Sequence, residues 1–351
     1  MLKSLSKLSP GVDFKDYLLL MGVPDDGRVL AQGQGLLRRP TYVFSGTCSY
    51  LSYLGDRLAG AREIWFAPPA GPMSLRIAPG PMVNYLADPD IYGMALAKAE
   101  RLARAMGRPC LNPPGAVLRS GRDKVARALA GMPGVVAPRT ERLSSAGPQE
   151  LARMIADLGM TYPVLIRPVG AHGGKELLRR DRPEDLEGLV AGWMCGAQVY
   201  VTEFHPFADP DGVHRKYRLA VIGDQIILRH VIIGDTWMLH ADSQGVDTEA
   251  DEEARLASFQ EGLLPVIAPV VHEIARRLEL DVFGIDCHLD QDGRLLVFEA
   301  NACMNFLART VPPPNMWDAP VEAIRTALLD LLADPTRWRH AGDDGSPGTP
   351  L

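Results

Sequence analysis

Two apolar segments near the end of the chain are joined by a polar turn, and each segment carries a carboxylate. The segments are Phe283-Gly-Ile-Asp286 and Leu296-Val-Phe-Glu299-Ala-Asn301, and the turn is Asp290-Gln-Asp-Gly293. Because successive side chains of a strand point to opposite faces, Glu299 and Asn301 share one face, and a short hairpin brings Asp286 beside them. Carboxylates that face inward among apolar neighbours are costly unless a cation accompanies them. The hairpin therefore predicts a cation site, and solvent-facing strand carboxylates are the alternative.

The order of the predicted elements indicates more than one domain, as the length of 351 residues also does. In the first part, Thr41–Phe44, Ile64–Phe66 and a segment that begins at Met82 are predicted strands. A long helix is predicted at about 90–106, with apolar residues at helical spacing. Strands that alternate with helices favour a parallel α/β layer. Residues 1 to about 38 are expected to form a weakly specified lead-in.

The rest of the chain is predicted to form mixed α/β units. Strands are expected at 133–138, 163–167 and 198–204, and Gly223-Asp224 is typical of a tight hairpin between the apolar segments 217–222 and 225–229. Helices are expected at 148–159, 262–278 and 319–333. The tail from residue 341 to residue 351 consists of disorder-promoting residues.

Composition and charge exclude several classes of protein. The formal net charge of -6 argues against a general nucleic-acid binder. No segment approaches the roughly 20 apolar residues that a membrane-spanning helix needs, so we expect no membrane partner and a cytoplasmic location. The five cysteines are scattered and form no CxxC pair, which indicates reduced thiols rather than a disulfide framework or a zinc ribbon.

A second pattern joins a cationic strand end to a glycine-rich loop. The strand Tyr162-Pro-Val-Leu-Ile-Arg167 is followed by a loop that contains Gly170, Gly173 and Gly174 and ends at Lys175. Glycines let backbone N–H groups approach phosphate oxygens, and the lysine adds positive charge. A glycine loop by itself is more often an ordinary turn, so the pattern gains weight only from its neighbours in the chain.

The order of these patterns resembles the ATP-grasp superfamily. The series consists of Arg122-Asp-Lys124, the 162–175 strand and loop, Tyr200-Val-Thr-Glu203-Phe204, Lys216-Tyr-Arg218 and the hairpin of Asp286, Glu299 and Asn301. It covers about residues 80 to 310 and is closest to carboxylate–amine ligases such as D-alanine–D-alanine ligase and the glutamate ligases that extend protein tails. The resemblance implies an α/β (α+β) chain with the ATP-grasp fold. Its expected parts are a lead-in at 1–38, an N-terminal parallel α/β domain at 39–118, two α+β subdomains at 119–204 and 205–338 that clamp ATP, and a disordered tail at 339–351.

The resemblance also implies roles for single residues around ATP. Lys124 matches the first nucleotide-binding lysine, and Arg167 occupies the position of the second, where the family usually has lysine. Glu203 and Phe204 match the hinge that meets adenine. The loop that closes over the β- and γ-phosphates is matched by Gly170, His172, Gly173, Gly174 and Lys175.

Three residues match the ligands of Mg²⁺, which Mn²⁺ can replace: Asp286, Glu299 and Asn301. Arg218 matches the arginine that steadies the transferred phosphoryl group, and Arg229 is a candidate to share that duty. Two departures from the family pattern stand out. Lys216-Tyr-Arg218 replaces an Asp-x-Arg sequence. A Pro-Gly turn that helps to bind an amino-acid substrate is replaced by Ala-Cys-Met-Asn-Phe after Asn301, which argues against D-alanine ligation.

The implied reaction moves the γ-phosphoryl group of ATP to a carboxylate and then lets an amine displace phosphate from the acyl phosphate. The partners would be a small-molecule or peptide carboxylate and an amine, and the family leads us to expect a homodimer. The strand-end residues Ser45-Gly-Thr47 and Asn84 are candidates for substrate contact, with plain turns as the alternative. A kinase-like phosphoryl transferase and a non-catalytic nucleotide-binding protein are the rival functions. A dinucleotide-dependent oxidoreductase is disfavoured because no GxGxxG follows the first strand.

Overall fold

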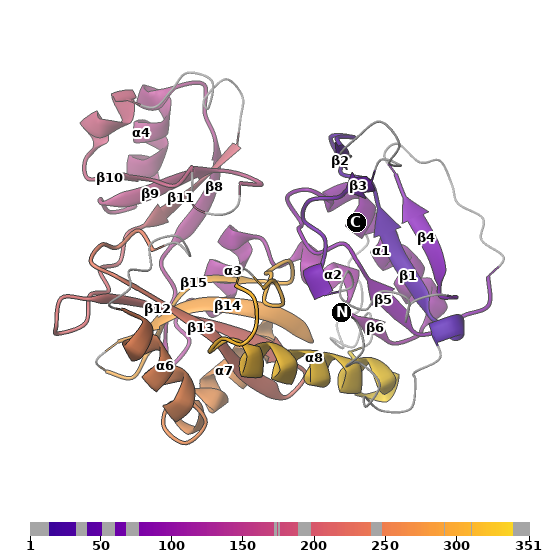
Figure 1. Ribbon diagram of the computed structural model, residues 1–351. Coiled ribbons are helices and arrows are strands. Elements are labelled where there is room, and N and C mark those ends of the chain that lie inside the picture. The colour runs from indigo at the N-terminus through magenta and orange to yellow at the C-terminus, as the bar shows by residue number, and fades with distance from the viewer. Residues whose placement is uncertain are drawn as a thin grey trace.

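The computed structural model describes residues 14–32, 41–50, 60–67, 77–171, 174, 176–188, 198–239, 248–290, 292–309 and 311–339. Three of the predicted loop residues, His172, Gly173 and Lys175, lie outside these ranges, and so does the predicted tail at 341–351. The described part of the chain contains four sheets, and we call the three largest the first, middle and large sheets (Figure 1). No helix in the described ranges combines the length and the apolar character that a membrane crossing requires.

The first sheet is parallel, with strand order β4-β1-β5-β6. Its strands are β1 (Leu18–Gly22), β4 (Arg62–Phe66), β5 (Met82–Asn84) and β6 (Cys110–Leu111), and the helices of this region are α1 (Gly93–Met106) and α2 (Pro114–Leu118). The expected parallel α/β layer is confirmed for the strands predicted at 64–66 and from Met82, whereas the strand predicted at 41–44 lies outside it. A short 3-10 helix, η1 (Phe14–Asp16), precedes β1, and β2 (Leu30–Gln32) and β3 (Thr41–Val43) form a separate antiparallel pair.

Strand β1 corrects the expectation that residues 1–38 are only a lead-in. It lies between β4 and β5, so it is an inner strand of the first sheet. Leu18 and Leu20 are fully buried and Leu19 is almost so. An inner strand of a parallel sheet is covered on both faces and therefore appears in the sequence as a continuous apolar run without alternation. That is why the segment Leu-Leu-Leu-Met-Gly carried no strand periodicity.

The middle sheet is antiparallel, with strand order β10-β9-β11-β8. Its strands are β8 (Thr140–Ser144), β9 (Val164–Pro168), β10 (Leu178–Arg180) and β11 (Gln198–Glu203), and α4 (Pro148–Asp157) and the 3-10 helix η4 (Pro183–Gly188) pack against it. Leu151 and Ile155 of α4 are fully buried against Val164, Ile166 and Val201. The middle sheet thus has a hydrophobic core of its own.

The large sheet has strand order β13-β12-β14-β15-β7. Its strands are β7 (Val135–Val136), β12 (His214–Ile222), β13 (Gln225–Gly234), β14 (Val282–Leu289) and β15 (Leu295–Asn301), and all neighbours are antiparallel except β15 and β7. The helices of this part are α3 (Arg122–Leu129), α6 (Glu249–Ser258), α7 (Leu264–Leu278), α8 (Asp318–Ala333) and the 3-10 helix η7 (Pro335–Arg337). The predicted hairpin at Gly223 is confirmed, and its positive φ of 56° suits glycine.

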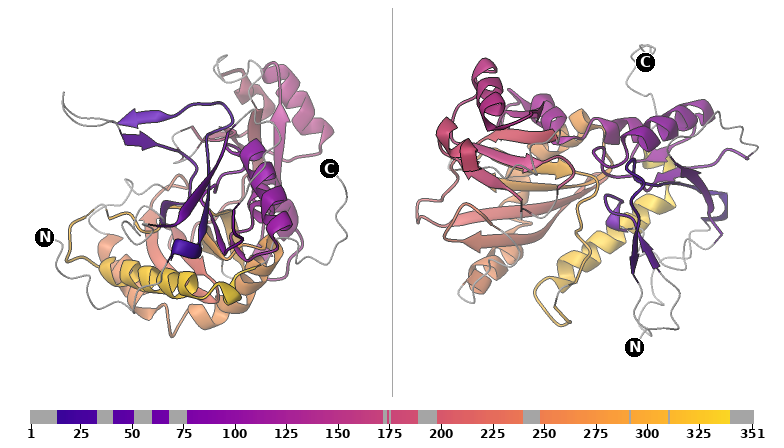
Figure 2. Two further views of the ribbon diagram at one scale, coloured as in Figure 1. Left: turned by 90° about the vertical axis from the view of Figure 1, so that its right-hand side faces the viewer. Right: turned by 90° about the horizontal axis from the view of Figure 1, so that it is seen from above.

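The first and large sheets share one hydrophobic core, whereas the middle sheet stands apart from it. Helix α8 contacts β12 and β13, and Leu332 near its end accepts a hydrogen bond from the Tyr17 hydroxyl beside β1. In Figures 1 and 2, the middle sheet lies over the large sheet on the side away from α8. The space between the middle and large sheets is where the functional residues gather.

Candidate active site

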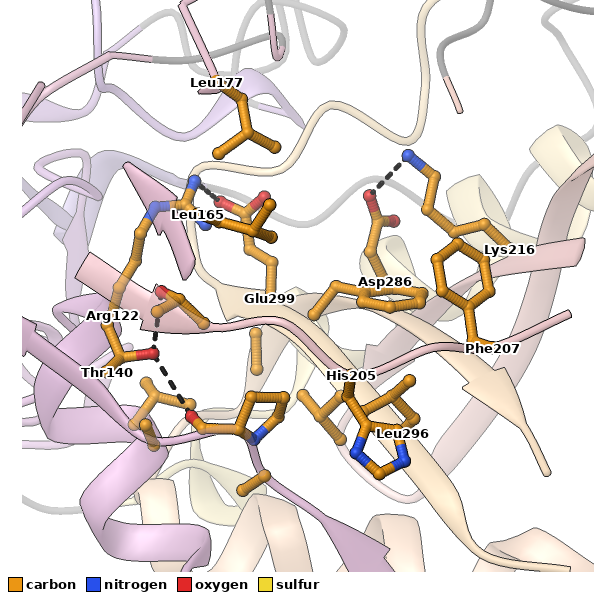
Figure 3. Close-up of a pocket in the computed structure, with 18 of the residues that line it drawn as sticks. Arg122, Thr140, Leu165, Leu177, His205, Phe207, Lys216, Asp286, Leu296 and Glu299 are labelled. Atoms are coloured by element: carbon orange, nitrogen blue, oxygen red, sulfur yellow. Dashed lines mark hydrogen bonds and ion pairs between the residues drawn. The ribbon is translucent and has the colours of Figure 1, made fainter. Parts of the chain in front are cut away.

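A cavity of about 530 Å³ lies between the middle and large sheets. Its walls come from the start of α3, from β9 and β11 of the middle sheet, and from β12, β14 and β15 of the large sheet (Figure 3). One end of the cavity is apolar and the other is charged. The polar and charged side chains in the lining are Ser120, Arg122, Thr140, Arg167, Thr202, Glu203, His205, Lys216, Arg218, Asp286, Glu299 and Asn301.

A row of four polar side chains crosses the large sheet at one register. Glu299 of β15 lies opposite Asp286 of β14, which lies opposite Arg218 of β12, which lies opposite His230 of β13. Residues directly opposite each other in a ladder share a face of the sheet. The row therefore places two carboxylates and a guanidinium on the cavity side, and Asn301, two residues after Glu299, lines the cavity with them.

A β-bulge in β15 brings consecutive residues to the same cavity. The pairing moves from Asp286↔Glu299 to Cys287↔Val297, which leaves Phe298 as an extra residue. In a regular strand, Phe298 and Glu299 would point to opposite faces. Bulges re-aim side chains in this way, often next to active sites. Here both residues line the cavity, so an aromatic ring and a carboxylate stand side by side where the apolar and charged ends meet.

Ion pairs hold both carboxylates of the row. Arg218 makes two hydrogen bonds to Asp286, Nε to Oδ1 at 2.7 Å and an Nη to Oδ2 at 2.8 Å, and Lys216 Nζ lies 3.7 Å from Oδ2. Arg122 donates to Glu299 Oε1 at 2.5 Å. Burial alone would raise the pKa of Asp286, but Arg218 and Lys216 hold that pKa well below its usual value. Cationic side chains therefore neutralise both Asp286 and Glu299.

Arg167 is a half-buried cation that lacks a carboxylate partner within ion-pair distance among the described residues. Its guanidinium donates to the carbonyl of Ala171 in the glycine loop, and its Nε has no hydrogen-bond partner in the described part of the structure. Burial, and then the nearby charge of Arg122, lower the pKa of Arg167 to about 10. A cation that is partly removed from water and has no carboxylate partner gains from an anion, so the position suits a cation that meets an anionic ligand.

The other end of the cavity is aromatic and aliphatic. Phe207, Ile232, Leu239 and Leu296 form a buried cluster with Trp237 and Phe298 beside it. The rings of Phe207 and Phe298 are 4.7 Å apart. This end is bordered by the hinge after β11, where Glu203 accepts a hydrogen bond from the N–H of Thr161 and the N–H of Phe204 donates to the carbonyl of Pro163.

The predicted oxygen ligands fit Mg²⁺ in their chemistry. Two carboxylates and one amide oxygen are hard donors of the kind that Mg²⁺ takes together with phosphate oxygens. Among the described residues, no cluster of three His, Cys, Asp or Glu side chains is placed to hold a metal. Asp286, Glu299 and Asn301 would therefore hold Mg²⁺ only in company with oxygens from a ligand, and Arg122 and Arg218 would have to release the two carboxylates.

The structure brings most of the predicted site residues into one cavity. Those that line it are Arg167, Gly174, Glu203, Phe204, Arg218, Asp286, Glu299 and Asn301. Lys124, Gly170 and Arg229 do not line it. The lining also contains Arg122 and Lys216, for which the sequence patterns predicted no role. Both lie within motifs that were singled out, two residues before Lys124 and two before Arg218, so helical and strand spacing could have identified them.

Lys124 and Arg229 are directed elsewhere for physical reasons. Lys124 Nζ donates to the carbonyl of Leu118 at 2.8 Å, and the first turn of α3 presents Arg122 to the cavity instead. Arg229 is the extra residue of a second bulge, because Arg218 pairs with His230 and Leu219 pairs with Leu228. Its guanidinium donates to the carbonyls of Phe306 and Ala308. In this structure Arg229 therefore braces the segment that follows β15.

The candidate substrate residues of the first sheet have internal roles. Thr47 Oγ1 donates to the carbonyl of Phe44 at 3.0 Å. Asn84 is 2% exposed and its Oδ1 accepts the N–H of Leu86. Neither residue lines the cavity. Thr47 and Asn84 therefore stabilise the local chain, and their contact with a substrate stays a prediction.

Comparison with solved structures identifies the architecture. The D-alanine–D-alanine ligase from Bacillus anthracis superposes with a TM-score of 0.50, at 13% identity, over 92% of this chain and 97% of that chain. This chain has the ATP-grasp fold. The ATP-grasp fold was the expectation from the order of motifs, and it is confirmed.

Two further structures are also similar. The RimK domain ATP-grasp protein from Sphaerobacter thermophilus matches at 15% identity with a TM-score of 0.45, over 90% of this chain and 98% of that one. The D-alanine–D-alanine ligase from Coxiella burnetii matches at 14% identity with a TM-score of 0.46, over 74% of this chain and 70% of that one. No protein-family model matches the sequence, and no curated protein does. The fold rests on the match to the Bacillus anthracis structure, and the role of each residue rests on the geometry of the cavity.

Proposed function

We propose that the chain is an ATP-dependent carboxylate–amine ligase that forms an amide bond and releases ADP and phosphate. The observation that carries the proposal is the cavity with two unlike ends. Aromatic and aliphatic side chains line one end, and four cations face two carboxylates at the other. A purine base suits the first surface and a triphosphate with a divalent cation suits the second. The ATP-grasp fold shared with a ligase supports this assignment.

The adenine base would lie at the apolar end, between the Phe207 and Leu296 cluster and the hinge of Glu203 and Phe204. The triphosphate would extend along β15 toward Glu299. Four cationic side chains surround that part of the cavity: Arg122, Arg167, Lys216 and Arg218. Arg167 supports this direction most strongly, because a phosphate oxygen would supply the anion that its half-buried guanidinium lacks among the described residues.

Asp286, Glu299 and Asn301 would hold Mg²⁺, or Mn²⁺ in its place, which supplies positive charge against the phosphate oxygens. Arg122 and Arg218 now neutralise the two carboxylates, and both guanidinium groups are within reach of the phosphate end of the cavity. The bidentate geometry of arginine suits phosphate as well as carboxylate. We infer that the two arginines exchange the carboxylates for phosphate oxygens when the nucleotide binds.

The reaction has two balanced steps. A carboxylate oxygen of the substrate attacks the γ-phosphorus, the bond from that phosphorus to the β–γ bridging oxygen breaks, and ADP leaves. The amine nitrogen then attacks the carbonyl carbon of the acyl phosphate, the carbon–oxygen bond to phosphate breaks, and the amine loses a proton. Arg218 and Arg167 would stabilise the charge on the transferred phosphoryl group, which is the main contribution of protein side chains to phosphoryl transfer.

The test measures ADP, phosphate and hydroxamate formed from Mg-ATP with a pooled panel of carboxylates and with hydroxylamine as the amine. Hydroxylamine captures an acyl phosphate as a hydroxamate, which ferric ion reveals by colour. We expect carboxylate-dependent release of ADP and phosphate, hydroxamate in equal amount, and loss of all three in Glu299→Ala. The matched control is Glu273→Ala, because the Glu273 carboxylate is held by Arg276 and Arg277 on α7.

The products separate the rival functions. A kinase that phosphorylates a hydroxyl or an amine would release ADP and keep the phosphate on its product, without hydroxamate. A kinase that stops at an acyl phosphate would give hydroxamate with hydroxylamine but no amide when an ordinary amine replaces it. A non-catalytic protein would bind Mg-ATP in a way that depends on Glu299 and turn over none of it. Release of AMP and pyrophosphate would contradict an acyl-phosphate mechanism.

A further inference from the structure

The segment that follows Asn301 is buried against the large sheet. Ala302, Met304 and Phe306 are each at most 5% exposed. The carbonyl of Met304 accepts a hydrogen bond from Ser49 Oγ at 3.3 Å, and Arg229 binds the carbonyl of Phe306 at 2.8 Å. The segment is therefore fixed from two sides, by the part of the chain next to the first sheet and by β13. It stands where the sequence departs from the usual Pro-Gly turn.

The side chain of Met304 lies directly on Gly284. A Cβ atom added to Gly284 would lie 2.2 Å from the sulfur of Met304 and less than 3 Å from its Cβ and Cγ. Gly284 precedes Asp286 by two residues on β14, so it faces the same side of the large sheet. It is the ladder partner of Asn301 and, on its other side, of Ala220. Gly284 and Ala220, which have little or no side chain, thus form a depression beside the proposed metal ligands. The thioether of Met304 fills this depression over Gly284.

The position of this depression follows the direction of the cavity. Along β15, the apolar end lies at Leu296 and Phe298, the charged row lies at Glu299, and the cavity ends at Asn301. Phosphoryl transfer needs the attacking and leaving oxygens roughly in line. A carboxylate that attacks the γ-phosphorus must therefore approach from the end opposite the base, where Asn301, Gly284 and Met304 lie. Neither Gly284 nor Met304 lines the present cavity, and the Met304 side chain occupies the space over Gly284 next to the end of the cavity at Asn301.

We propose that Met304 sets the size of the subsite for the carboxylate substrate, by filling the depression over Gly284 and Ala220. The inference rests on the proposed ligase function. The proposal implies a substrate in which the group attached to the carboxylate is short or unbranched where it faces Met304. A flexible, unbranched thioether suits such a wall, since methionine fills irregular space without a fixed shape.

The experiment compares wild-type protein with Met304→Ala over straight-chain carboxylates of two to eight carbons and α-amino acids from glycine to phenylalanine. Hydroxamate formation gives kcat/KM for each acid with hydroxylamine. We expect the ratio of kcat/KM for large over small acids to rise in Met304→Ala by about 10–200-fold, the range that one methylene group decides in an apolar pocket. Met160→Ala is the matched control, because Met160 belongs to the separate core of the middle sheet. Its ratio should equal that of the wild type.

A second pair of variants tests the contact itself. Gly284→Ala forces Met304 out of the depression, so we expect it to lower kcat/KM for small acids, while the double variant Gly284→Ala with Met304→Ala regains activity. A clash that is only structural would also be relieved in the double variant, but the ratio of kcat/KM for large over small acids would then stay at the wild-type value in all variants. The same size profile in wild type and Met304→Ala would overturn the role of Met304 alone. Absence of turnover with every acid in all variants would instead overturn the ligase function, and the inference with it.

Discussion

The guanidinium of Arg122 lies 2.5 Å from Glu299 Oε1, although 177 positions separate the two residues in the chain. The contact joins the first turn of α3 to the last residues of β15, which are the two sides of the charged end of the cavity. Arg122 thus neutralises the central carboxylate of the proposed metal set.

Arg122→Gln should weaken binding of Mg-ATP by roughly 10–100-fold, because it removes charge-assisted hydrogen bonds worth about 1.5–3 kcal/mol. Isothermal titration calorimetry measures the effect. Arg127→Gln is the matched control, since Arg127 is on the same helix and its side chain is 68% exposed. Lys124→Gln tests whether Lys124 binds the nucleotide, as the family pattern implies, or only supports the Leu118 carbonyl, as the structure indicates. The structure predicts little change, and a loss as large as that of Arg122→Gln would contradict it.

Arg167→Met should have opposite effects on stability and on nucleotide binding. It replaces a half-buried guanidinium that lacks a carboxylate partner among the described residues, so the melting temperature without ligand should stay equal or rise. The added stability that Mg-ATP gives the wild type should be lost. Thermal unfolding without ligand and with about 1 mM Mg-ATP measures the stability of the free protein and the stabilisation by the nucleotide. A variant that melts lower without ligand and keeps the full ligand shift would refute the assignment.

Lys216→Asp would restore the Asp-x-Arg sequence common in the family, and we expect it to impair this protein. Lys216 Nζ lies 3.7 Å from Asp286, so an aspartate would place like charges side by side on the cavity wall. The affinity for Mg-ATP should fall further than in Lys216→Met, which removes the positive charge without adding a negative one. Nucleotide titration of the three proteins under one salt condition gives the order. Equal affinity of Lys216→Asp and the wild type would show that the lysine plays no part in phosphate binding.

Asp281 should make folding stability depend on pH in the opposite sense to a usual surface aspartate. Burial raises its pKa to about 6, and Arg339 offsets only part of that increase. The folded state therefore keeps a proton that the unfolded state has already released, so stability falls as pH rises from about 4 to about 6 and is then constant. A difference of about two pKa units corresponds to roughly 3 kcal/mol.

Urea unfolding of wild type and Asp281→Asn from pH 4 to pH 7 tests this. The free energy of unfolding of the wild type minus that of Asp281→Asn should fall as pH rises from about 4 to about 6, because the two proteins share every other titrating group. A difference that does not vary with pH would contradict a raised pKa at Asp281.

Local patterns predicted the parts of the site that lie on single strands. The alternation of Glu299 and Asn301, and the hairpin that brings Asp286 to them, needed only strand geometry. The Gly223 hairpin and the main helices were likewise local. These features supply the proposed metal set and most of the large sheet.

The features that could not be predicted from the sequence depend on contacts between distant segments. The pairing of Arg122 with Glu299 exists only after α3 packs beside β15. The two bulges shift the register by one residue, which turned Phe298 into the cavity and Arg229 out of it. Strand β1 was missed because an inner strand of a parallel sheet carries no alternation.

The bulge at Phe298 also bears on how relatives of this chain should be sought. A relative with a regular β15 would keep its two carboxylates opposite each other with one residue fewer between them. A search that fixes the spacing between Asp286 and Glu299 would pass over such a chain, even if every ligand were present. Spacing that is allowed to vary by one residue would recover it, and the residue at the insertion would show whether an aromatic base platform accompanies the metal site.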